Sequence, residues 1–294
     1  LKLLPRMFSL KKEELINVLP KNGPTIEETI KYLEKYAEDY IVIKMGGSVL
    51  SNKDLFNNLI KDIIILKKLK LSIFLIHGGG SKISSKLDAN NIESKFINGL
   101  RVTDDKTINI VEDVLIEFNR EIVNALKEQS CNAEVITSKE NNVIIVKPEN
   151  NVLGFVGKPT KINADNLIEI VKANKVPVIA SLGLDENNQT FNINADSVAG
   201  AIAKKLKARR LLMLSDVEGV LNKDRVLVPE INSDQAKKMI DDGIISGGMI
   251  PKINNCLDVA KNGVKGVCII DGKKKHSILF ELLSDKGSGT LIRE

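Results

Sequence analysis

The chain has 294 residues, with 43 basic against 38 acidic side chains and a formal net charge of +5 at pH 7. A chain of this length can bury a sizeable core and forms one large domain or two lobes. The basic excess is spread along the sequence, and aromatic residues make up only 4%, with no tryptophan. We therefore expect a solvated, lysine-rich surface and no nucleic-acid partner, because single-strand binding relies on aromatic stacking platforms.

Membrane insertion and an oxidising compartment are also disfavoured. Each apolar run is shorter than a bilayer-spanning helix, so we expect neither a membrane contact nor a cleaved leader. The cysteines Cys131, Cys256 and Cys268 are odd in number and lack metal-ligand spacing. They are typical of reduced core thiols in a cytoplasmic protein without a metal centre of its own.

The first 39 residues are expected to lie outside the repeating core. Residues 1–24 form a lysine-rich lead-in that ends in a helix-breaking Gly-Pro pair. A helix is predicted over 25–38, because Thr25 and Glu28 have capping-box spacing and apolar residues recur at helical intervals. An element before the first core strand usually packs on the outside of a domain or on another subunit.

From residue 40 onward, strand and helix patterns alternate. This order predicts an α/β fold with a largely parallel sheet covered on both faces, and ligands bind such sheets beyond the carboxyl ends of the strands. Strands are predicted over 40–44, 71–77, 176–181, 210–215, 266–271 and 289–293, with short β-rich pieces over 133–163. Helices are predicted over 53–70, 81–91, 105–129, 195–207, 233–242, 250–262 and 276–283.

Two glycine-rich loops each follow an apolar strand. They are Lys44-Met45-Gly46-Gly47-Ser48 and His77-Gly78-Gly79-Gly80-Ser81. Glycine lets the backbone approach a ligand closely, and the start of the next helix directs free N–H groups at an anion. Neither loop fits G-x-G-x-x-G, and the chain has no G-x-x-x-x-G-K-[S/T]. The pair therefore predicts a phosphate site outside the two common nucleotide fingerprints.

Two basic residues are placed where they can hold anions. Lys44 ends a buried strand directly before paired glycines, where a lysine can neutralise a phosphate or the charge of phosphoryl transfer. Arg101 lies in the loop before the long helix, and its planar fork suits a carboxylate. The plain alternative for both is a solvated side chain at the surface.

Three further segments carry polar residues at element boundaries. Asn192-Ile193-Asn194-Ala195-Asp196 opens a helix, either as a simple capping cluster or with Asp196 fixing a catalytic lysine. The loop 215–220 follows an apolar strand and suits a ribose or a phosphate, although a plain β-turn would look the same. Lys252 lies near a helix start, where the dipole disfavours a cation, so we expect an anion between the lysine and the helix, with an exposed lysine as the alternative.

Taken in order, these segments resemble the amino acid kinase family, from about residue 25 to the end. Within it they resemble the branch that phosphorylates N-acetyl-L-glutamate on the way to arginine. The resemblance implies an open three-layer α/β/α sandwich with an amino-acid lobe over about 40–190 and a nucleotide lobe over about 191–294. It rests on Lys44-x-Gly46-Gly47, His77-Gly78-Gly79-Gly80, Gly99-x-Arg101-x-Thr103-Asp104, Asn192-x-Asn194-Ala195-Asp196, Ser215-Asp216-x-x-Gly219 and Gly247-Gly248-Met249-x-x-Lys252.

The resemblance also implies a reaction and residue roles. ATP, with Mg²⁺, would phosphorylate the γ-carboxylate of N-acetyl-L-glutamate to give N-acetyl-L-glutamyl 5-phosphate. Lys44 and Lys252 would stabilise the transferring phosphoryl group, and Asp196 would orient both lysines. The amino-acid substrate would be bound by Gly79, Gly80, Arg101 and Asn192, and ATP by Gly46, Gly47, Ser215, Asp216, Gly219, Gly248 and Met249.

The chemistry of this reaction agrees with the composition. A γ-carboxylate has an ordinary pKa near ~4.3 and is already ionised at neutral pH, so no general base is needed. The chain has only two histidines, His77 and His276, and the sequence offers no nucleophile–base pair. Catalysis would then consist of in-line positioning and charge neutralisation, with Mg²⁺ carried largely by ATP.

A second resemblance concerns regulation. The helix over 25–38 resembles the N-terminal helix that links dimers of arginine-inhibited family members into a hexameric ring. Tyr32 would lie beside the inhibitor arginine, and His276, Glu281 and Gly287 resemble the rest of that site. An ordinary amphipathic helix and a surface turn are the alternative.

Other functions share part of the pattern. Carbamate, uridylate, glutamate, aspartate and aminoadipate kinases have some of the same motifs, and substrate length depends on contacts that the sequence does not show. A non-catalytic arginine-sensing domain is a further alternative, although it would be expected to lack Lys44, Asp196 or Lys252, which are all present. A dinucleotide-dependent oxidoreductase is disfavoured because its fingerprint is missing.

Overall fold

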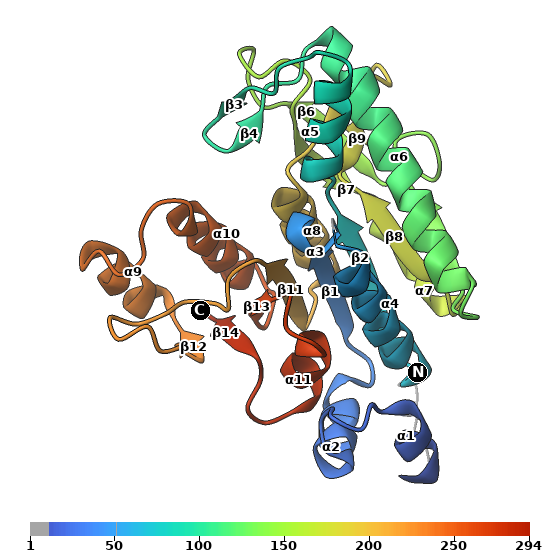
Figure 1. Ribbon diagram of the computed structural model, residues 1–294, viewed down its shortest axis with the longest axis vertical. Helices are drawn as coiled ribbons and strands as arrows, with labels where there is room; N and C mark the ends of the chain where they lie inside the picture. Colours follow the sequence, from blue (N-terminus) through green and yellow to red (C-terminus); the bar gives the residue numbers. More distant parts are fainter. Residues whose placement is uncertain (1–11, 51) are drawn as a thin grey trace.

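An eight-stranded sheet forms the centre of the computed structural model, which describes residues 12–50 and 52–294 (Figure 1). Its strands are β1 Tyr40–Met45, β2 Ser72–His77, β5 Ala133–Ile136, β8 Val176–Ala180, β11 Arg210–Ser215, β12 Glu230–Ile231, β13 Val267–Asp271 and β14 Gly289–Ile292. Their order is β12-β14-β13-β11-β1-β2-β8-β5. Only β13 and β14 pair in antiparallel fashion; the other neighbours in this sheet are parallel. The predicted mainly parallel sheet is confirmed.

Helices cover both faces of the sheet (Figure 1). One face packs against α4 Lys53–Lys68, α6 Asp105–Lys127 and α11 Ser277–Leu283. The other packs against α7 Ala164–Lys172, α8 Ala195–Leu206, α9 Ser233–Asp241 and α10 Met249–Lys261. The predicted three-layer α/β/α sandwich is therefore confirmed, and α7 is an addition that the sequence pattern did not predict.

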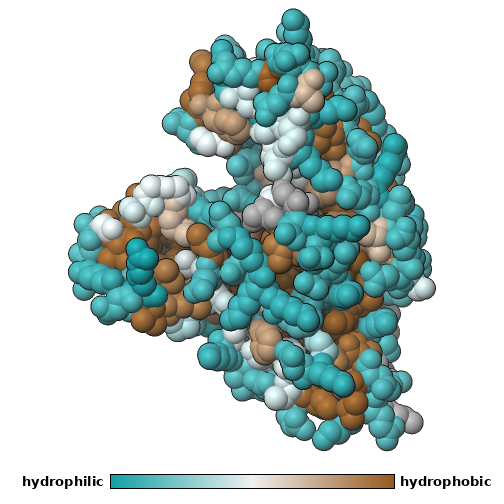
Figure 2. Space-filling model, viewed as in Figure 1, coloured by the Kyte–Doolittle hydropathy of each residue, from teal (hydrophilic) through white to brown (hydrophobic). Residues whose placement is uncertain are grey.

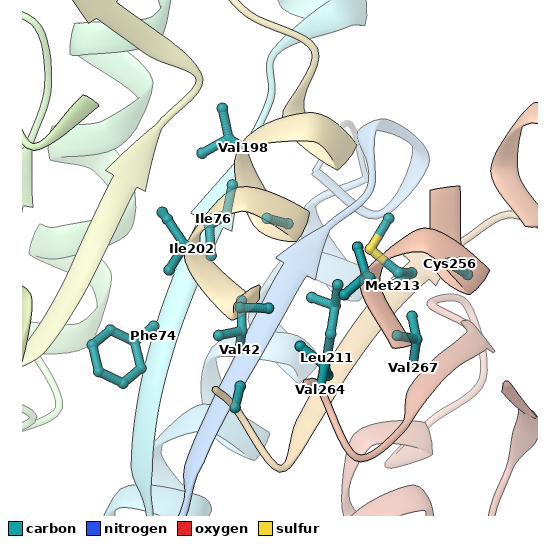
Figure 3. Packing of buried hydrophobic residues seen from close by; sticks show 14 of the residues in the cluster. Val42, Phe74, Ile76, Val198, Ile202, Leu211, Met213, Cys256, Val264 and Val267 are labelled. Carbon is teal, nitrogen blue, oxygen red and sulfur yellow. The ribbon is translucent and has the colours of Figure 1, made fainter. Parts of the chain in front are cut away.

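Successive residues of the central strands enter opposite layers of the core. Figure 3 shows Val42, Leu211 and Val267 on the side that α8 and α10 cover. Ile41 and Ile43, the chain neighbours of Val42, belong to the cluster on the opposite face. Because both faces are buried, the strands read as continuous apolar runs instead of alternating polar and apolar residues.

Two smaller β structures lie outside the central sheet. A four-stranded sheet has the order β10-β9-β6-β7, with β6 Ile144–Pro148, β7 Gly157–Ile162, β9 Leu182–Leu184 and β10 Thr190–Asn192. A short antiparallel hairpin of β3 Phe96–Ile97 and β4 Leu100–Arg101 lies beside α5 Gly80–Ala89 (Figure 1). The sequence predicts β pieces over 133–163 but not this hairpin, because each of its strands has only two residues.

Two helices, α1 Lys12–Val18 and α2 Ile26–Tyr36, precede the core. The predicted capping box of α2 is confirmed, since Thr25 and Glu28 each accept a backbone N–H from the other at 3.2 Å. Leu33 and Tyr36 are buried against α11, so α2 contributes to the core of its own chain. The lysine-rich composition of the lead-in concealed α1, and residues 1–11 lie outside the described part.

None of the helices described between residues 12 and 294 is both long and apolar enough to cross a bilayer.

Candidate active site

The two glycine loops meet at one edge of the sheet. Strand β1 pairs with β2 on one side and with β11 on the other, which places Lys44 in register with Ile76 and Met213. The strands are parallel, so the loops after all three leave at their carboxyl ends, where ligands of such sheets bind. Gly46 comes directly after β1 and lies very close to β11. A Cβ atom on it would be 2.5 Å from the Leu214 carbonyl oxygen. Only glycine fits this crossing without a shift of the backbone.

A cavity of about 260 Å³ opens at this edge. Its walls come from both glycine loops, the β3–β4 hairpin and the start of α8. Figure 2 shows the surface hollowed between the part that carries β3, β4 and α5 and the part that carries α9 and α10. Of the residues predicted to bind or react, the cavity is lined by Lys44, Gly47, Gly79, Gly80, Arg101, Asn192 and Asp196.

Two lysines converge on one carboxylate at the cavity. The Lys44 Nζ lies 2.8 Å from Asp196 Oδ1, and the Lys252 Nζ lies 3.9 Å from Asp196 Oδ2. Burial alone would raise the pKa of Asp196, but Lys44 and Lys252 outweigh it, so the pKa lies below its usual value. Asp196 therefore stays ionised and fixes both ammonium groups. This is the lysine–carboxylate pairing that the sequence predicts for Asp196.

The start of α8 holds Asp196 in place. Asn194 caps this helix, and its side-chain oxygen accepts the backbone N–H groups of Asp196 at 2.9 Å and Ser197 at 3.2 Å. Both earlier interpretations of the 192–196 segment therefore apply, since Asn194 is a cap and Asp196 a lysine partner. The carboxylate lies in the first turn, where the helix dipole favours negative charge.

The guanidinium of Arg101 is fixed by neighbours on α5 and in the segment after it. It donates hydrogen bonds to Ser84 Oγ at 2.9 Å, to the Gly80 carbonyl at 3.0 Å and to Ser94 Oγ at 2.5 Å. The Phe96 ring lies 4.6 Å from the guanidinium carbon, and Arg101 is 7% exposed. An arginine has five N–H donors, so these three hydrogen bonds leave one donor on Nε and one on Nη1 without a protein partner among them.

The second glycine loop gives the cavity a backbone wall. Gly79 precedes α5, and a Cβ atom there would lie 2.8 Å from the Leu115 side chain. At Gly80 a Cβ atom would meet no atom within 4 Å. A side chain at the first glycine would therefore displace the end of Leu115, whereas the second leaves open space at the start of a helix that can receive an anion.

Several of the predicted ATP-binding residues lie around Lys252, outside the lining of the cavity. The Lys252 Nζ donates to Ser215 Oγ at 3.3 Å, and that hydroxyl donates to Asp216 Oδ1 at 3.2 Å. Gly248 and Met249 start α10, which carries Lys252 in its first turn. Gly219 has a φ of +144° and packs against Thr290. Ser215 is thus brought to the lysine pair, while Gly219 lies against β14.

The residues predicted to bind arginine lie around α11. The Tyr32 hydroxyl donates to Asp285 Oδ1 at 3.0 Å. Glu281 Oε2 accepts the backbone N–H groups of Ser288 at 2.8 Å and Gly289 at 3.2 Å, next to Gly287. The His276 ring instead donates to Asp62 Oδ1 of α4 at 2.7 Å. Three of the four predicted residues therefore lie along the 281–289 turn or contact it, and the fourth is paired elsewhere.

His77 is a buried, neutral histidine. Its Nδ1 donates to the Gly78 carbonyl at 3.1 Å and its Nε2 accepts the Asn119 amide at 3.0 Å, an arrangement that fits only one neutral tautomer. Burial lowers the pKa of His77 to about 4. The ring is fully enclosed and is not among the cavity-lining groups. Through its hydrogen bond to the Gly78 carbonyl, His77 supports the second glycine loop from the buried side.

Sequence reasoning did not select Phe96 and Ser181, which also line the cavity. Phe96 belongs to the hairpin around Asn98-Gly99, and an Asn-Gly pair between apolar residues is a known hairpin signal. Ser181 follows β8 directly, at the same edge of the sheet as the glycine loops. The position of Ser181 at the carboxyl end of a predicted strand was the sequence feature that could have marked it as a site residue.

Within residues 12–50 and 52–294, no group of three or more His, Cys, Asp or Glu side chains is arranged to hold a metal ion. Asp196, the acidic residue at the cavity, is committed to two lysines.

Comparison with known proteins agrees with this geometry. Residues 39–271 match the model of the amino acid kinase family. The chain is 67% identical over 288 residues to the acetylglutamate kinase of Pelagibacter ubique, which covers 98% of this chain and 100% of the relative. It is 40% identical over 283 residues to that of Nitrobacter hamburgensis, which covers 92% of this chain and 95% of the relative.

A solved structure has the same fold. N-acetylglutamate synthase from Neisseria gonorrhoeae, complexed with coenzyme A and N-acetyl-glutamate, superposes with a TM-score of 0.82. The match covers 91% of this chain and 62% of the synthase chain at 22% identity, so it concerns the fold alone.

The chain belongs to the amino acid kinase family, and it is a phosphotransferase. Its two cationic side chains, held at a cavity beyond a parallel sheet, are the parts that such chemistry needs. Within the family its sequence groups with the acetylglutamate kinases.

Proposed function

We propose that this enzyme transfers the γ-phosphoryl group of ATP to the γ-carboxylate of N-acetyl-L-glutamate, forming N-acetyl-L-glutamyl 5-phosphate for arginine biosynthesis. The observation that carries the proposal is the row formed by Lys44, Asp196 and Lys252 beside a cavity that Arg101 and Asn192 also line. The 67% identity to an acetylglutamate kinase supports the choice of substrate.

The cavity supplies the groups that an N-acylated dicarboxylate requires. Arg101 would hold the α-carboxylate through its positive charge and a remaining N–H donor, because hydrogen bonds from an ionised donor to a carboxylate are the strong ones. Asn192 would contact the acetamido end, and the backbone of Gly79 and Gly80 would border the substrate. The γ-carboxylate would then point toward Lys44.

Catalysis would depend on charge neutralisation and positioning. The substrate carboxylate is ionised at neutral pH, and nothing has to remove a proton from it. Lys44 and Lys252 would neutralise the oxygens of the phosphoryl group in transit, while Asp196 keeps the two ammonium groups at fixed positions. Preorganised charges of this kind act without reorganisation at the moment of reaction.

The nucleotide would lie on the side of α10 and β11. Backbone N–H groups of Gly46 and Gly47 would contact phosphate oxygens, as the close approach of this loop to β11 allows. Ser215, Asp216, Gly219, Gly248 and Met249 would border the rest of ATP. When bound, Mg²⁺ held by the triphosphate would supply further charge neutralisation. On this proposal, residues 40–190 form the amino-acid lobe and 191–294 the nucleotide lobe.

Regulation by arginine is a further part of the proposal. Arginine would bind between α2 and the 281–289 turn, where Tyr32, Glu281 and Gly287 lie, with His276 at the start of α11. The exposed apolar face of α2, which includes Ile30, would join dimers into a hexamer. The three free, buried cysteines support a cytoplasmic location.

An ATP-consumption assay with a panel of acceptors tests this function. The panel comprises N-acetylglutamate, glutamate, aspartate, carbamate and N-acetylaminoadipate, each with and without arginine. We expect turnover with N-acetylglutamate above all others. Preferred turnover with a different acceptor would replace the substrate, and ATP consumption with none of them would favour a non-catalytic arginine-sensing role.

A further inference from the structure

Thr103 lies behind the amino-acid pocket and contacts two of its residues. It is fully buried and does not line the cavity. Its hydroxyl donates to the Arg101 carbonyl at 2.9 Å and accepts the Asn192 side-chain amide at 3.3 Å. One hydroxyl group therefore links Arg101 and Asn192, the two residues proposed to hold the substrate with their side chains, which are 91 positions apart in the chain.

The hydroxyl determines which way the Asn192 amide faces. A threonine hydroxyl has one proton, and here that proton is donated to the Arg101 carbonyl. Its oxygen can then only accept, so Asn192 must present its NH₂ group to Thr103. The Asn192 carbonyl oxygen takes the opposite side of the amide, where no hydrogen-bond partner occurs among the described residues. The ambiguity between the oxygen and nitrogen of an asparagine is thereby removed by its neighbour.

The backbone around Thr103 makes this arrangement rigid. Thr103 donates its N–H to Leu153 at 2.9 Å and accepts the Phe155 N–H at 2.7 Å. Phe155 in turn accepts the Asn192 N–H at 2.9 Å. A Cβ atom at Gly154 would lie 2.3 Å from the Thr103 carbonyl oxygen, so the segments approach as closely as glycine permits.

We propose that Thr103 is a positioning residue that fixes the Asn192 amide with its carbonyl oxygen toward the cavity, as an acceptor for an N–H group of the amino-acid substrate. The inference rests on the proposed function, because N-acetylglutamate carries such an amide N–H. Thr103 itself touches no substrate and acts through Asn192.

Replacement of the hydroxyl without a change of shape tests this role. Thr103→Val keeps the volume and removes both hydrogen bonds, whereas Thr103→Ser keeps the hydroxyl. We expect T103V to raise the KM for N-acetylglutamate by about tenfold, with the KM for ATP within about twofold, because a buried hydrogen bond to the pocket is lost. T103S should keep both KM values within about threefold of the unsubstituted chain.

A matched control separates positioning from stability. Thr290 is also fully buried, and its hydroxyl donates to the Val228 carbonyl at 2.7 Å and accepts the Val220 N–H at 2.8 Å. Thr290→Val therefore removes the same kind of group far from the amino-acid pocket. It should lower the melting temperature as T103V does but leave the KM for N-acetylglutamate within about twofold.

A double-mutant cycle with Asn192→Ala gives the decisive readout. If Thr103 acts through Asn192, T103V adds no further increase in KM in the N192A background. Equal effects of T103V in both backgrounds, or an unchanged KM in T103V, would overturn the inference about Thr103. The proposed function would still stand if the unsubstituted chain phosphorylates N-acetylglutamate. An unsubstituted chain that neither binds N-acetylglutamate in calorimetry nor turns it over would overturn both.

Discussion

At the scale of single residues, the site separates charge stabilisation from proton transfer. The only titratable ring near the glycine loops, His77, is buried and neutral, while Lys44 faces the cavity. We expect Lys44→Ala to lower kcat by at least about 100-fold, as loss of one preorganised charge does at other transfer sites. His77→Asn should lower the thermal stability through its lost hydrogen bonds, with kcat per folded molecule reduced less than about tenfold. Steady-state kinetics corrected for the folded fraction measure both, and comparable losses in kcat would contradict catalysis without a general base.

The buried pair of Asp62 and His276 has a separate effect, on stability. Burial raises the pKa of Asp62 to about 6, although the hydrogen bond from His276 works against the rise. An aspartate in an unfolded chain has a pKa of about 3.9. Between these values the folded state binds more protons than the unfolded state. This group therefore makes the free energy of unfolding fall as pH rises from about 4 to about 6.

Asp62→Asn should remove this contribution. Urea unfolding of the unsubstituted chain and of D62N, measured from pH 4.5 to pH 7, is expected to show a flatter pH dependence in D62N over the lower part of that range. Asp54→Asn, an exposed change on the same helix, is the control and should keep the original slope. If D62N kept the slope of the unsubstituted chain, the titration would have to be assigned to another group.

At the scale of elements, α2 depends on a cap that also contacts the turn after α11. Glu28 accepts the Thr25 N–H within the capping box and also the Asp285 N–H at 3.1 Å. Thr25→Ala removes the side-chain oxygen that accepts the Glu28 N–H and should destabilise α2 by about 1 kcal/mol. Hydrogen exchange of the amides of residues 26–36 should then accelerate by about fivefold, with kcat unchanged. Thr25→Ser keeps the oxygen and should exchange at nearly the original rate, and equal rates in both variants would show that the cap does not hold α2.

The elements also show what the sequence could and could not predict. The core strands, the long helices and the α2 cap were predictable because burial on both faces, helical periodicity and capping-box spacing are local signals. The β3–β4 hairpin was missed because each of its strands has only two residues. Helix α7 was missed although its nine residues equal those of the predicted helix α9. Thr103 belongs to the Gly99-x-Arg101-x-Thr103-Asp104 motif, but its contact with Asn192 was not predictable, because only the folded chain brings the two residues together. The pairing of His276 with Asp62 is likewise a long-range contact without a local pattern.

At the scale of the whole molecule, the proposed catalytic and regulatory regions lie at opposite ends of the same strand. Strand β1 begins at Tyr40, just after α2, and ends beside Lys44 and the cavity (Figure 1). Helix α2 also packs on α11, which lies in the proposed nucleotide lobe. A change at α2 therefore has a short, packed route to both lobes, while leaving the reacting groups themselves untouched.

This separation predicts that assembly and catalysis can be uncoupled. Ile30 lies on α2 with 38% of its surface exposed, and Val226 is a similarly apolar residue, 58% exposed, in the distant loop between β11 and β12. We expect the unsubstituted chain to sediment as a hexamer that arginine inhibits. Ile30→Glu should leave dimers that retain kcat within about threefold and lose most of the arginine sensitivity, because a buried unpaired charge disfavours the contact between dimers. Val226→Glu should keep both the hexamer and the inhibition.

Sedimentation velocity, with parallel activity assays at millimolar arginine, makes this comparison. If the unsubstituted chain were dimeric and insensitive to arginine, the regulatory proposal would be contradicted and the catalytic one would still stand.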